Sequence, residues 1–132
     1  MKHLRVTAAV IERDGRFLIC RRRQGGELPR KWEFPGGKIE PGESETDCLS
    51  RELREELSVE ARPRRRLGTV EQERPDGRLE LIAWCTDIGA SAPVLGDHEE
   101  LAWVRPEDLG GYDLAPADEE IAKWIAFGHP EG

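Results

Sequence analysis

The sequence predicts a single α/β domain in which a mixed β-sheet carries helices on its faces. Strand-like segments rich in Val, Ile and aromatic residues alternate irregularly with two helix-like segments, a pattern typical of helices packed against a sheet. Two pairs of strands are joined by the turn sequences Asp14-Gly15 and Pro75-Asp76-Gly77, which favour hairpins. The length of 132 residues suits one domain, residues 1–132, and leaves little room for a second.

The strands are expected where short β-branched or aromatic runs are bounded by turn residues. The Gly- and Pro-containing segment 24–31 is expected to be a loop, and the short strand that follows it breaks at Pro35-Gly36-Gly37. The expected strands are residues 4–12, 16–21, 32–34, 64–73, 78–86 and 101–104.

Two helices are expected. The first begins at Ser44, whose hydroxyl can cap the helix with Asp47 three residues further on, and it continues to Leu57. The second covers residues 119–127, where apolar residues recur at helical spacing.

Composition and charge exclude several classes of protein. The net charge is −7, divided into +6 over residues 1–38 and −13 over the remainder, which is unlike a uniformly basic nucleic-acid-binding protein. No apolar run approaches the roughly 20 residues of a membrane span. The N-terminus has no signal-peptide pattern. A basic first part and an acidic later part suit a site where metal ions bridge carboxylates to an anionic substrate.

The three cysteines point to a reducing compartment. Cys20, Cys48 and Cys85 are widely spaced and form no CxxC pair, which argues against a disulfide framework or a zinc site. We therefore expect a cytoplasmic protein without a membrane segment.

The first predicted helix carries an unusual cluster of carboxylates. On a helical wheel, Leu49, Leu53 and Leu57 form the buried stripe, and three glutamates follow on one side of it. These are Glu52, Glu55 and Glu56.

This cluster destabilises the helix that carries it. Like charges three and four residues apart each cost roughly 0.2–0.5 kcal/mol, and Glu55 and Glu56 lie near the negative end of the helix dipole. A divalent cation among the carboxylates would explain the arrangement, and hard oxygen ligands suit Mg²⁺ or Mn²⁺. A charged, solvated helix face is the alternative explanation for the carboxylates alone.

The segment before the helix favours the metal site. Residues 37–59 read GKIEPGESETDCLSRELREELSV and resemble the Nudix box, GX5EX7REUXEEXGU, in which U is an aliphatic residue. The matching positions are Gly37, Glu43, Arg51, Glu52, Leu53, Glu55, Glu56 and Val59.

One position departs from the motif. Ser58 stands where the family has Gly, at a helix end that favours the left-handed conformation. No proposed ligand is lost, so we expect a slightly altered helix end with activity retained.

The resemblance implies a Nudix fold, an α/β/α sandwich with a mixed sheet, and a metal site. Glu52, Glu55 and Glu56 would bind Mg²⁺, with Mn²⁺ as the alternative, together with the backbone carbonyl of Gly36. Glu52 would activate the attacking water or act only as a ligand. Arg51 is expected to form a supporting ion pair with Glu43.

In many relatives a further carboxylate comes from the loop before the last strand. This chain offers Asp97, Glu99 and Glu100 there, and alignment on Trp103 favours Asp97 as an additional catalytic residue. The neighbouring His98 is expected either to face solvent or to support a ligand.

The flanking segments resemble those of MutT-type triphosphatases. Residues 32–40 resemble the segment that precedes the helix in that group, and residues 114–118 resemble its late base-contacting segment. Within or near them lie the candidate substrate-binding residues: Arg21, Arg22, Glu33, Phe34, Lys38 and Asp118.

Asp118 bears on the choice of nucleotide. An ionised Asp only accepts hydrogen bonds, so it favours an amino group such as that of cytosine or adenine, unless burial keeps the carboxyl protonated. Together with residues 11–15, this pattern resembles the CTP pyrophosphohydrolase branch more than the branch that removes oxidised guanine nucleotides.

We therefore expect a Mg²⁺-dependent pyrophosphohydrolase that converts a nucleoside triphosphate to the monophosphate and pyrophosphate. Its substrates would be CTP, dCTP or modified deoxynucleotides. The alternatives are a Nudix hydrolase of diphosphate-linked substrates such as ADP-ribose or a nucleotide sugar, and a Nudix-fold binding module without catalysis. No stable nucleic-acid partner is expected, and the protein would be a monomer or a homodimer.

Overall fold

The computed structural model describes residues 2–25 and 28–129. Part of the predicted loop 24–31, namely residues 26 and 27, lies outside this range, as do residue 1 and residues 130–132 of the predicted domain. In the part of the chain that is described, no helix is long and apolar enough to cross a membrane.

The larger part of the fold is a three-stranded sheet with the order β1-β6-β5. Strand β1 (Lys2–Val10) runs parallel to β6 (Gly77–Asp87). Strand β5 (Arg62–Arg74) pairs antiparallel with β6 through the predicted turn at residues 75–77. Two register shifts interrupt the β5–β6 ladder near Pro63 and Arg66.

A second sheet is built around β3 (Arg16–Arg21), which pairs antiparallel with each of its neighbours. These neighbours are β2 (Glu12–Arg13), β4 (Trp32–Glu33) and β7 (Glu100–Val104).

The predicted α/β architecture with a mixed sheet is confirmed, and the strands divide between two sheets because the free edge of β1 is already occupied. The amide of Thr7 donates to the carbonyl of Gly37 (2.8 Å), and the amide of Ala9 donates to that of Pro35 (2.7 Å). The loop after β4 therefore takes the place beside β1 that a further strand would fill. The predicted strand 4–12 is accordingly interrupted at Ile11, between β1 and β2.

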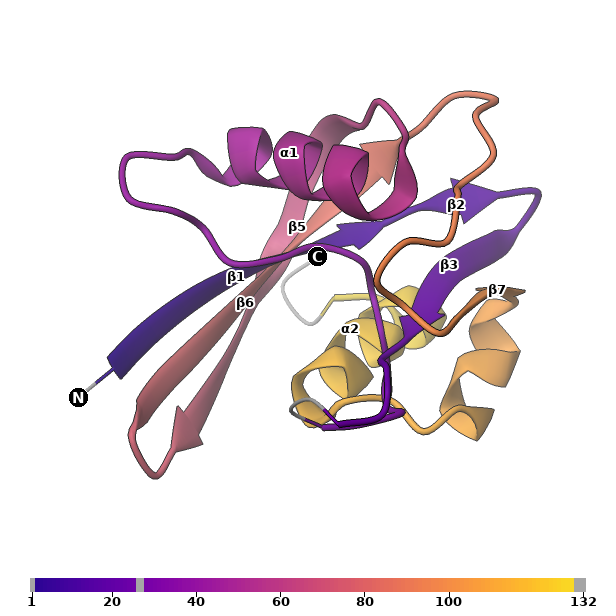
Figure 1. Cartoon of the computed structure of the whole chain (residues 1–132). Helices are drawn as coiled ribbons and strands as arrows, with labels where there is room; N and C mark the ends of the chain where they lie inside the picture. Colours follow the sequence, from indigo (N-terminus) through magenta and orange to yellow (C-terminus); the bar gives the residue numbers. More distant parts are fainter. Residues whose placement is uncertain (1, 26–27, 130–132) are drawn as a thin grey trace.

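The helices α1 (Glu45–Leu57) and α2 (Pro116–Phe127) lie on opposite sides of the strands (Figure 1). Alternate residues of β1 point to the two sides. Ala9 packs in one core cluster with Leu49, Leu53 and Leu57 of α1, whereas Ala8 belongs to the cluster that includes Ile121 of α2.

Helix α1 begins and ends at the predicted residues, but the alteration expected at its C-terminal end is absent. The Ser44 hydroxyl accepts a hydrogen bond from the amide of Asp47 (3.0 Å), which satisfies one of the free amides of the first turn. Ser58 adopts the left-handed conformation itself (φ 56°, ψ 38°), and its amide donates to the carbonyl of Arg54 (3.1 Å). The helix end is therefore closed as a glycine would close it.

The C-terminal region contains more helix than predicted. A 3₁₀ helix, η1 (Pro106–Gly111), follows β7, and α2 begins three residues before the predicted start. Pro116 occupies the first turn, where its missing N–H is no loss. Because that turn is also acidic, it shows little apolar periodicity in the sequence, although it places Asp118 in the interior, 5% exposed.

Candidate active site

The carboxylates of α1 divide into two environments. The side chains of Glu52 and Glu56 are each 15% exposed, whereas that of Glu55 is 60% exposed. The helical spacing therefore brings Glu52 and Glu56 to the sheltered side of the helix and leaves Glu55 at its solvent edge, 3.5 Å from Arg51.

Glu56 lies in a strongly acidic surrounding. Burial is the largest cause that raises its pKa, to about 9, followed by the charge and hydrogen bond of Glu52 and by the charges of Glu33 and Asp97. Among the described residues, its Oε2 atom is buried without a hydrogen-bond partner. Because a buried carboxylate oxygen without a partner is costly, this position suits a cation.

Arg51 joins the helix to the preceding loop. Its Nε donates to Glu43 Oε2 (2.7 Å) and its Nη2 to Glu43 Oε1 (3.0 Å), so the guanidinium and the carboxylate form a bidentate ion pair. Its Nη1 also donates to Glu52 Oε1 (2.8 Å). The geometry agrees with the predicted supporting ion pair.

The glycines of the loop after β4 allow two close approaches. A Cβ on Gly37 would lie 2.2 Å from the carboxyl carbon of Glu52, and a Cβ on Gly36 would lie 2.0 Å from the carbonyl oxygen of Thr7. Gly37 thus leaves the space that the Glu52 carboxylate occupies, and Gly36 lets the loop lie directly on β1.

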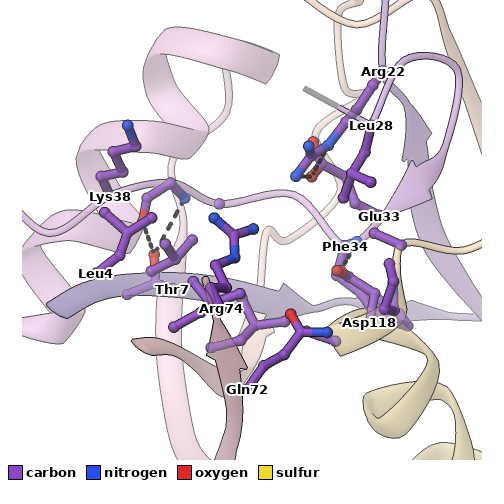
Figure 2. A pocket seen from close by; sticks show the side chains of 18 residues that line it. Leu4, Thr7, Arg22, Leu28, Glu33, Phe34, Lys38, Gln72, Arg74 and Asp118 are labelled. Carbon is purple, nitrogen blue, oxygen red and sulfur yellow. Dashed lines mark hydrogen bonds and ion pairs between the residues drawn. The ribbon is translucent and has the colours of Figure 1, made fainter. Parts of the chain in front are cut away.

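A pocket opens on the other side of this loop (Figure 2). Figure 2 shows Lys38 toward one end, Arg22, Glu33 and Asp118 toward the other, and Arg74 between them. The floor is apolar, formed by side chains of β1, β6 and α2: Leu4, Val6, Leu79, Leu81 and Ala117. Since Gly36 and Gly37 also line the pocket, it adjoins the Glu52 carboxylate.

Two carboxylates give the far end of the pocket its polarity. Glu33 accepts a hydrogen bond from Arg22 Nε (2.7 Å) and lies 2.8 Å from His98 Nε2. Burial alone would raise the pKa of Glu33, but the bonds to His98 and Arg22 outweigh it and lower the pKa below its ordinary value. Glu33 is therefore an ionised acceptor at neutral pH.

Asp118 is the second carboxylate. Its Oδ2 accepts a hydrogen bond from the amide of Phe34 (2.9 Å). Burial raises the pKa of Asp118 to about 7, with a further contribution from Glu33, and the Phe34 bond offsets only part of this. Near neutral pH the Asp118 carboxyl is consequently protonated in part of the molecules and ionised in the rest.

Comparison with known proteins identifies the family. Residues 1–126 match the NUDIX domain. The chain belongs to the Nudix family. It is 40% identical over 118 residues to the CTP pyrophosphohydrolase of Escherichia coli K12, covering 89% of this chain and 87% of that protein. It is 32% identical over 136 residues to the nucleoside triphosphatase NudI of Escherichia coli O1:K1, covering 93% and 96% of the two chains.

Solved structures of similar proteins share the fold. The solution structure of the E. coli ORF135 protein superposes with a TM-score of 0.84 at 35% identity, covering 100% of this chain and 96% of that one. The crystal structure of the MutT protein from Methanosarcina mazei Go1 gives a TM-score of 0.82 at 28% identity, covering 93% and 92%. The predictions of a Nudix fold and of a Nudix hydrolase are confirmed.

Other predicted site residues of this Nudix chain lie apart from the pocket. Arg21 pairs with Glu99 (3.0 Å) and Glu100 (3.4 Å), so of the two arginines chosen as substrate-binding candidates only Arg22 lines the pocket. Asp97 is exposed on the loop before β7. Its negative charge nevertheless contributes to the raised pKa of Glu56 on α1.

Three residues that line or border the site were not predicted as site residues. His98 is 7% exposed, so of its two expected positions the one facing solvent is wrong. Gln72 and Arg74 reach the pocket from β5. Their spacing of two residues on a strand places them on one face, and this alternation is the signal that could have indicated them.

The residues present fit a divalent cation in their chemistry. Within residues 2–25 and 28–129, no three His, Cys, Asp or Glu side chains already stand together as a ligand set. The unpartnered Glu56 oxygen, the adjacent Glu52 carboxylate and the space left by Gly37 nevertheless provide hard oxygen donors at one place, as Mg²⁺ or Mn²⁺ requires.

Proposed function

We propose that this Nudix hydrolase cleaves nucleoside triphosphates to the monophosphate and pyrophosphate in a reaction that depends on Mg²⁺ or Mn²⁺. The observation that carries the proposal is the position of the pocket: Gly37 lines it and also lies directly against the Glu52 carboxylate of α1. A nucleoside in the pocket could thus extend its phosphates past Lys38 toward Glu52 and Glu56.

In this proposal the carboxylates of Glu52, Glu55 and Glu56 and the carbonyl of Gly36 hold the metal. The bound metal would neutralise phosphate charge and lower the pKa of a water molecule. Glu52, oriented by Arg51, accepts the proton of the attacking water, and Asp97 supplies further negative charge beside Glu56. Water adds to a phosphorus, and the phosphoanhydride that joins the monophosphate to pyrophosphate breaks.

The polar end of the pocket suits a base that donates hydrogen bonds. Glu33 is an ionised acceptor, and Asp118 accepts in its ionised form. The exocyclic amino group of cytosine or adenine is a matching donor, which supports CTP, dCTP or modified deoxynucleotides as substrates. The E. coli relative at 40% identity is named a CTP pyrophosphohydrolase, which favours cytosine.

A substrate panel tests this proposal. The purified protein is incubated with the natural ribo- and deoxynucleoside triphosphates, an oxidised dGTP, ADP-ribose and a nucleotide sugar, each with Mg²⁺, with Mn²⁺ and with EDTA. We expect monophosphate and pyrophosphate from the cytidine nucleotides with either metal and no turnover in EDTA. Release of a phosphorylated sugar without pyrophosphate would favour the diphosphate-linked substrates instead.

An inactive binding module is separated from an enzyme by the metal-binding carboxylates. Glu52→Gln and Glu56→Gln should each lower metal-dependent turnover by orders of magnitude, because a neutral amide oxygen attracts a divalent cation less than a carboxylate does and cannot accept a proton from water. Glu60→Gln, at an exposed position beyond the same helix, is the matched control and should leave turnover unchanged. A wild-type protein that hydrolyses none of the panel with metal present contradicts the proposal.

A further inference from the structure

His98 lies between the two ends of the proposed site. It is on the loop before β7, and its imidazole side chain is 8% exposed. Its Nε2 is 2.8 Å from Glu33 Oε2 in the pocket, and its Nδ1 is 3.8 Å from Glu56 Oε2 on α1. One buried ring therefore faces a pocket residue with one nitrogen and a carboxylate of the metal-binding helix with the other.

The two facing atoms on the α1 side are both unsatisfied. Within the described residues 2–25 and 28–129, the buried side-chain nitrogen and oxygen atoms without a hydrogen-bond partner are His98 Nδ1 and Glu56 Oε2. The 3.8 Å between these two atoms is a contact distance rather than a hydrogen bond, so the ring limits where the Glu56 carboxylate can turn. On the pocket side the bond is already formed, and because ionised Glu33 can only accept, Nε2 is its donor.

Hydrogen bonds and a close backbone contact hold the loop that carries the His98 ring. Glu99 donates its amide to the carbonyl of Arg21 (2.9 Å), and Arg23 donates to the carbonyls of Gly96 (3.1 Å) and Asp97. Gly96 lies so close to the carbonyl of Glu56 that a Cβ there would approach it to 2.5 Å. The backbone on both sides of His98 is thus fixed to β3 and to the end of α1.

We propose that His98 is a positioning residue that couples the nucleoside pocket to the metal-binding helix by joining Glu33 to Glu56. The inference rests on the proposed function, since it concerns how the two ends of that site act on each other. A nucleotide base that donates a hydrogen bond to Glu33 competes with the bond from His98 Nε2. The ring then shifts, and its contact with Glu56 changes the orientation of that carboxylate. Partners of this kind behind a ligand typically alter metal affinity 10- to 100-fold.

The test measures Mn²⁺ affinity by electron paramagnetic resonance, without nucleotide and without turnover. Four proteins form a double-mutant cycle: wild type, His98→Ala, Glu33→Gln and the double variant. We expect His98→Ala to raise the Kd for Mn²⁺ about 10-fold or more. Glu33→Gln should also raise it, although Glu33 lies in the pocket, and the double variant should bind Mn²⁺ no more weakly than His98→Ala.

Two further variants separate positioning from general loss of structure. In His98→Asn the side-chain amide stands near the place of Nδ1 but is too short to reach Glu33, so Mn²⁺ affinity should recover toward that of the wild type. The matched control is Arg13→Ala. Arg13 ties the preceding part of the same connection by donating to the carbonyls of Gly89 and Ser91, and its loss should lower thermal stability without changing the Kd for Mn²⁺.

The proposal is overturned if His98→Ala binds Mn²⁺ within twofold of the wild type, or if the effects of His98→Ala and Glu33→Gln are additive. Failure of the proposed function gives a different result. A wild-type protein that binds Mn²⁺ but hydrolyses no triphosphate refutes that function, while the cycle still decides the coupling.

Discussion

Arg51 and Glu43 form a two-bond ion pair that ties helix α1 to the loop before it, with N–O distances of 2.7 and 3.0 Å. The same guanidinium donates to Glu52 (2.8 Å) and, through Nη2, to the carbonyl of Lys38 (3.1 Å). One side chain thus fixes the loop that borders the pocket and orients a proposed metal ligand. Its effect on function therefore extends beyond the stability of the helix.

Replacing Arg51 by Lys should impair catalysis more than folding. Lysine keeps the charge but presents a single nitrogen, so it cannot hold Glu43 with two bonds and Glu52 with a third. We expect kcat for the triphosphate to fall about 10- to 100-fold, with a drop in melting temperature of only a few degrees. Arg54→Lys, one turn further along on the exposed face, is the control; an equal loss of kcat there would remove the special role of Arg51.

The ion pair should also make the protein sensitive to acid. The hydrogen bonds of Arg51 lower the pKa of Glu43 from 4.5 to about 2, so the folded state favours the ionised carboxylate. The stabilisation is present above about pH 4.5 and is lost as the pH falls toward 2. We expect the difference in unfolding free energy between the wild type and Glu43→Gln to shrink over this range. Urea unfolding at several pH values measures it, and a constant difference contradicts the assignment.

Adding a methyl group at each of the two loop glycines should have different consequences. In Gly37→Ala the new Cβ meets the Glu52 carboxylate, a flexible side chain that can move away, so activity should fall while stability changes little. In Gly36→Ala it meets the backbone carbonyl of Thr7, which cannot move without shifting β1. That variant should lose melting temperature as well. Thermal unfolding together with kcat separates the two, and equal melting temperatures would contradict this reading.

The order of the elements could be predicted from the sequence because local chemistry marks their boundaries. Ser44 caps α1, the buried leucines repeat at helical spacing, and Asp14-Gly15 makes the first turn with positive φ at both residues (51° and 77°). The division into two sheets could not be predicted in this way. It depends on which segment occupies the edge of β1, a contact between residues 7 and 37 that no local pattern records.

The candidate site, like the fold, could be predicted only where local sequence determines it. The motif indicates the carboxylates of α1 because their residue types and spacing are set by the metal they would hold. The sequence does not decide the role of His98, because that role depends on burial between Glu33 and Glu56, which lie 65 and 42 positions away. The sequence indicates Asp118 as a base contact, but its raised pKa comes from burial in the first turn of α2, which lies before the predicted start of that helix.

Asp118 should make the stability of the protein fall as the pH rises. Because burial raises its pKa from 3.8 to about 7, the folded state favours the protonated carboxyl. The associated stabilisation is complete below about pH 4 and is lost between pH 4 and 7, at most about 4 kcal/mol for a shift of about three units. Asp118→Asn keeps an acceptor for the Phe34 amide without this titration. The variant should gain stability relative to the wild type as the pH rises, whereas a pH-independent difference contradicts the assignment.

Arg74 should contribute to substrate binding rather than to the chemical step. Its side chain lines the pocket between Lys38 and Asp118 (Figure 2), and within the described part of the chain no ion pair neutralises it. An unpaired cation in a pocket that receives a triphosphate should act mainly on binding. We expect Arg74→Ala to raise KM about 10-fold with kcat changed less than threefold, and the effect should weaken with added salt.

The control for Arg74 lies on the same hairpin. Arg78, directly after the turn, pairs with Glu71 (2.7 Å) and Glu73 (3.5 Å) and does not line the pocket. Its charge is already neutralised, so Arg78→Ala should leave KM unchanged. If both variants raise KM equally, the general charge of the hairpin attracts the substrate. If Arg74→Ala lowers kcat instead, Arg74 acts on the phosphates during hydrolysis. The phosphates would then pass Arg74 as well as Lys38 on their way toward α1.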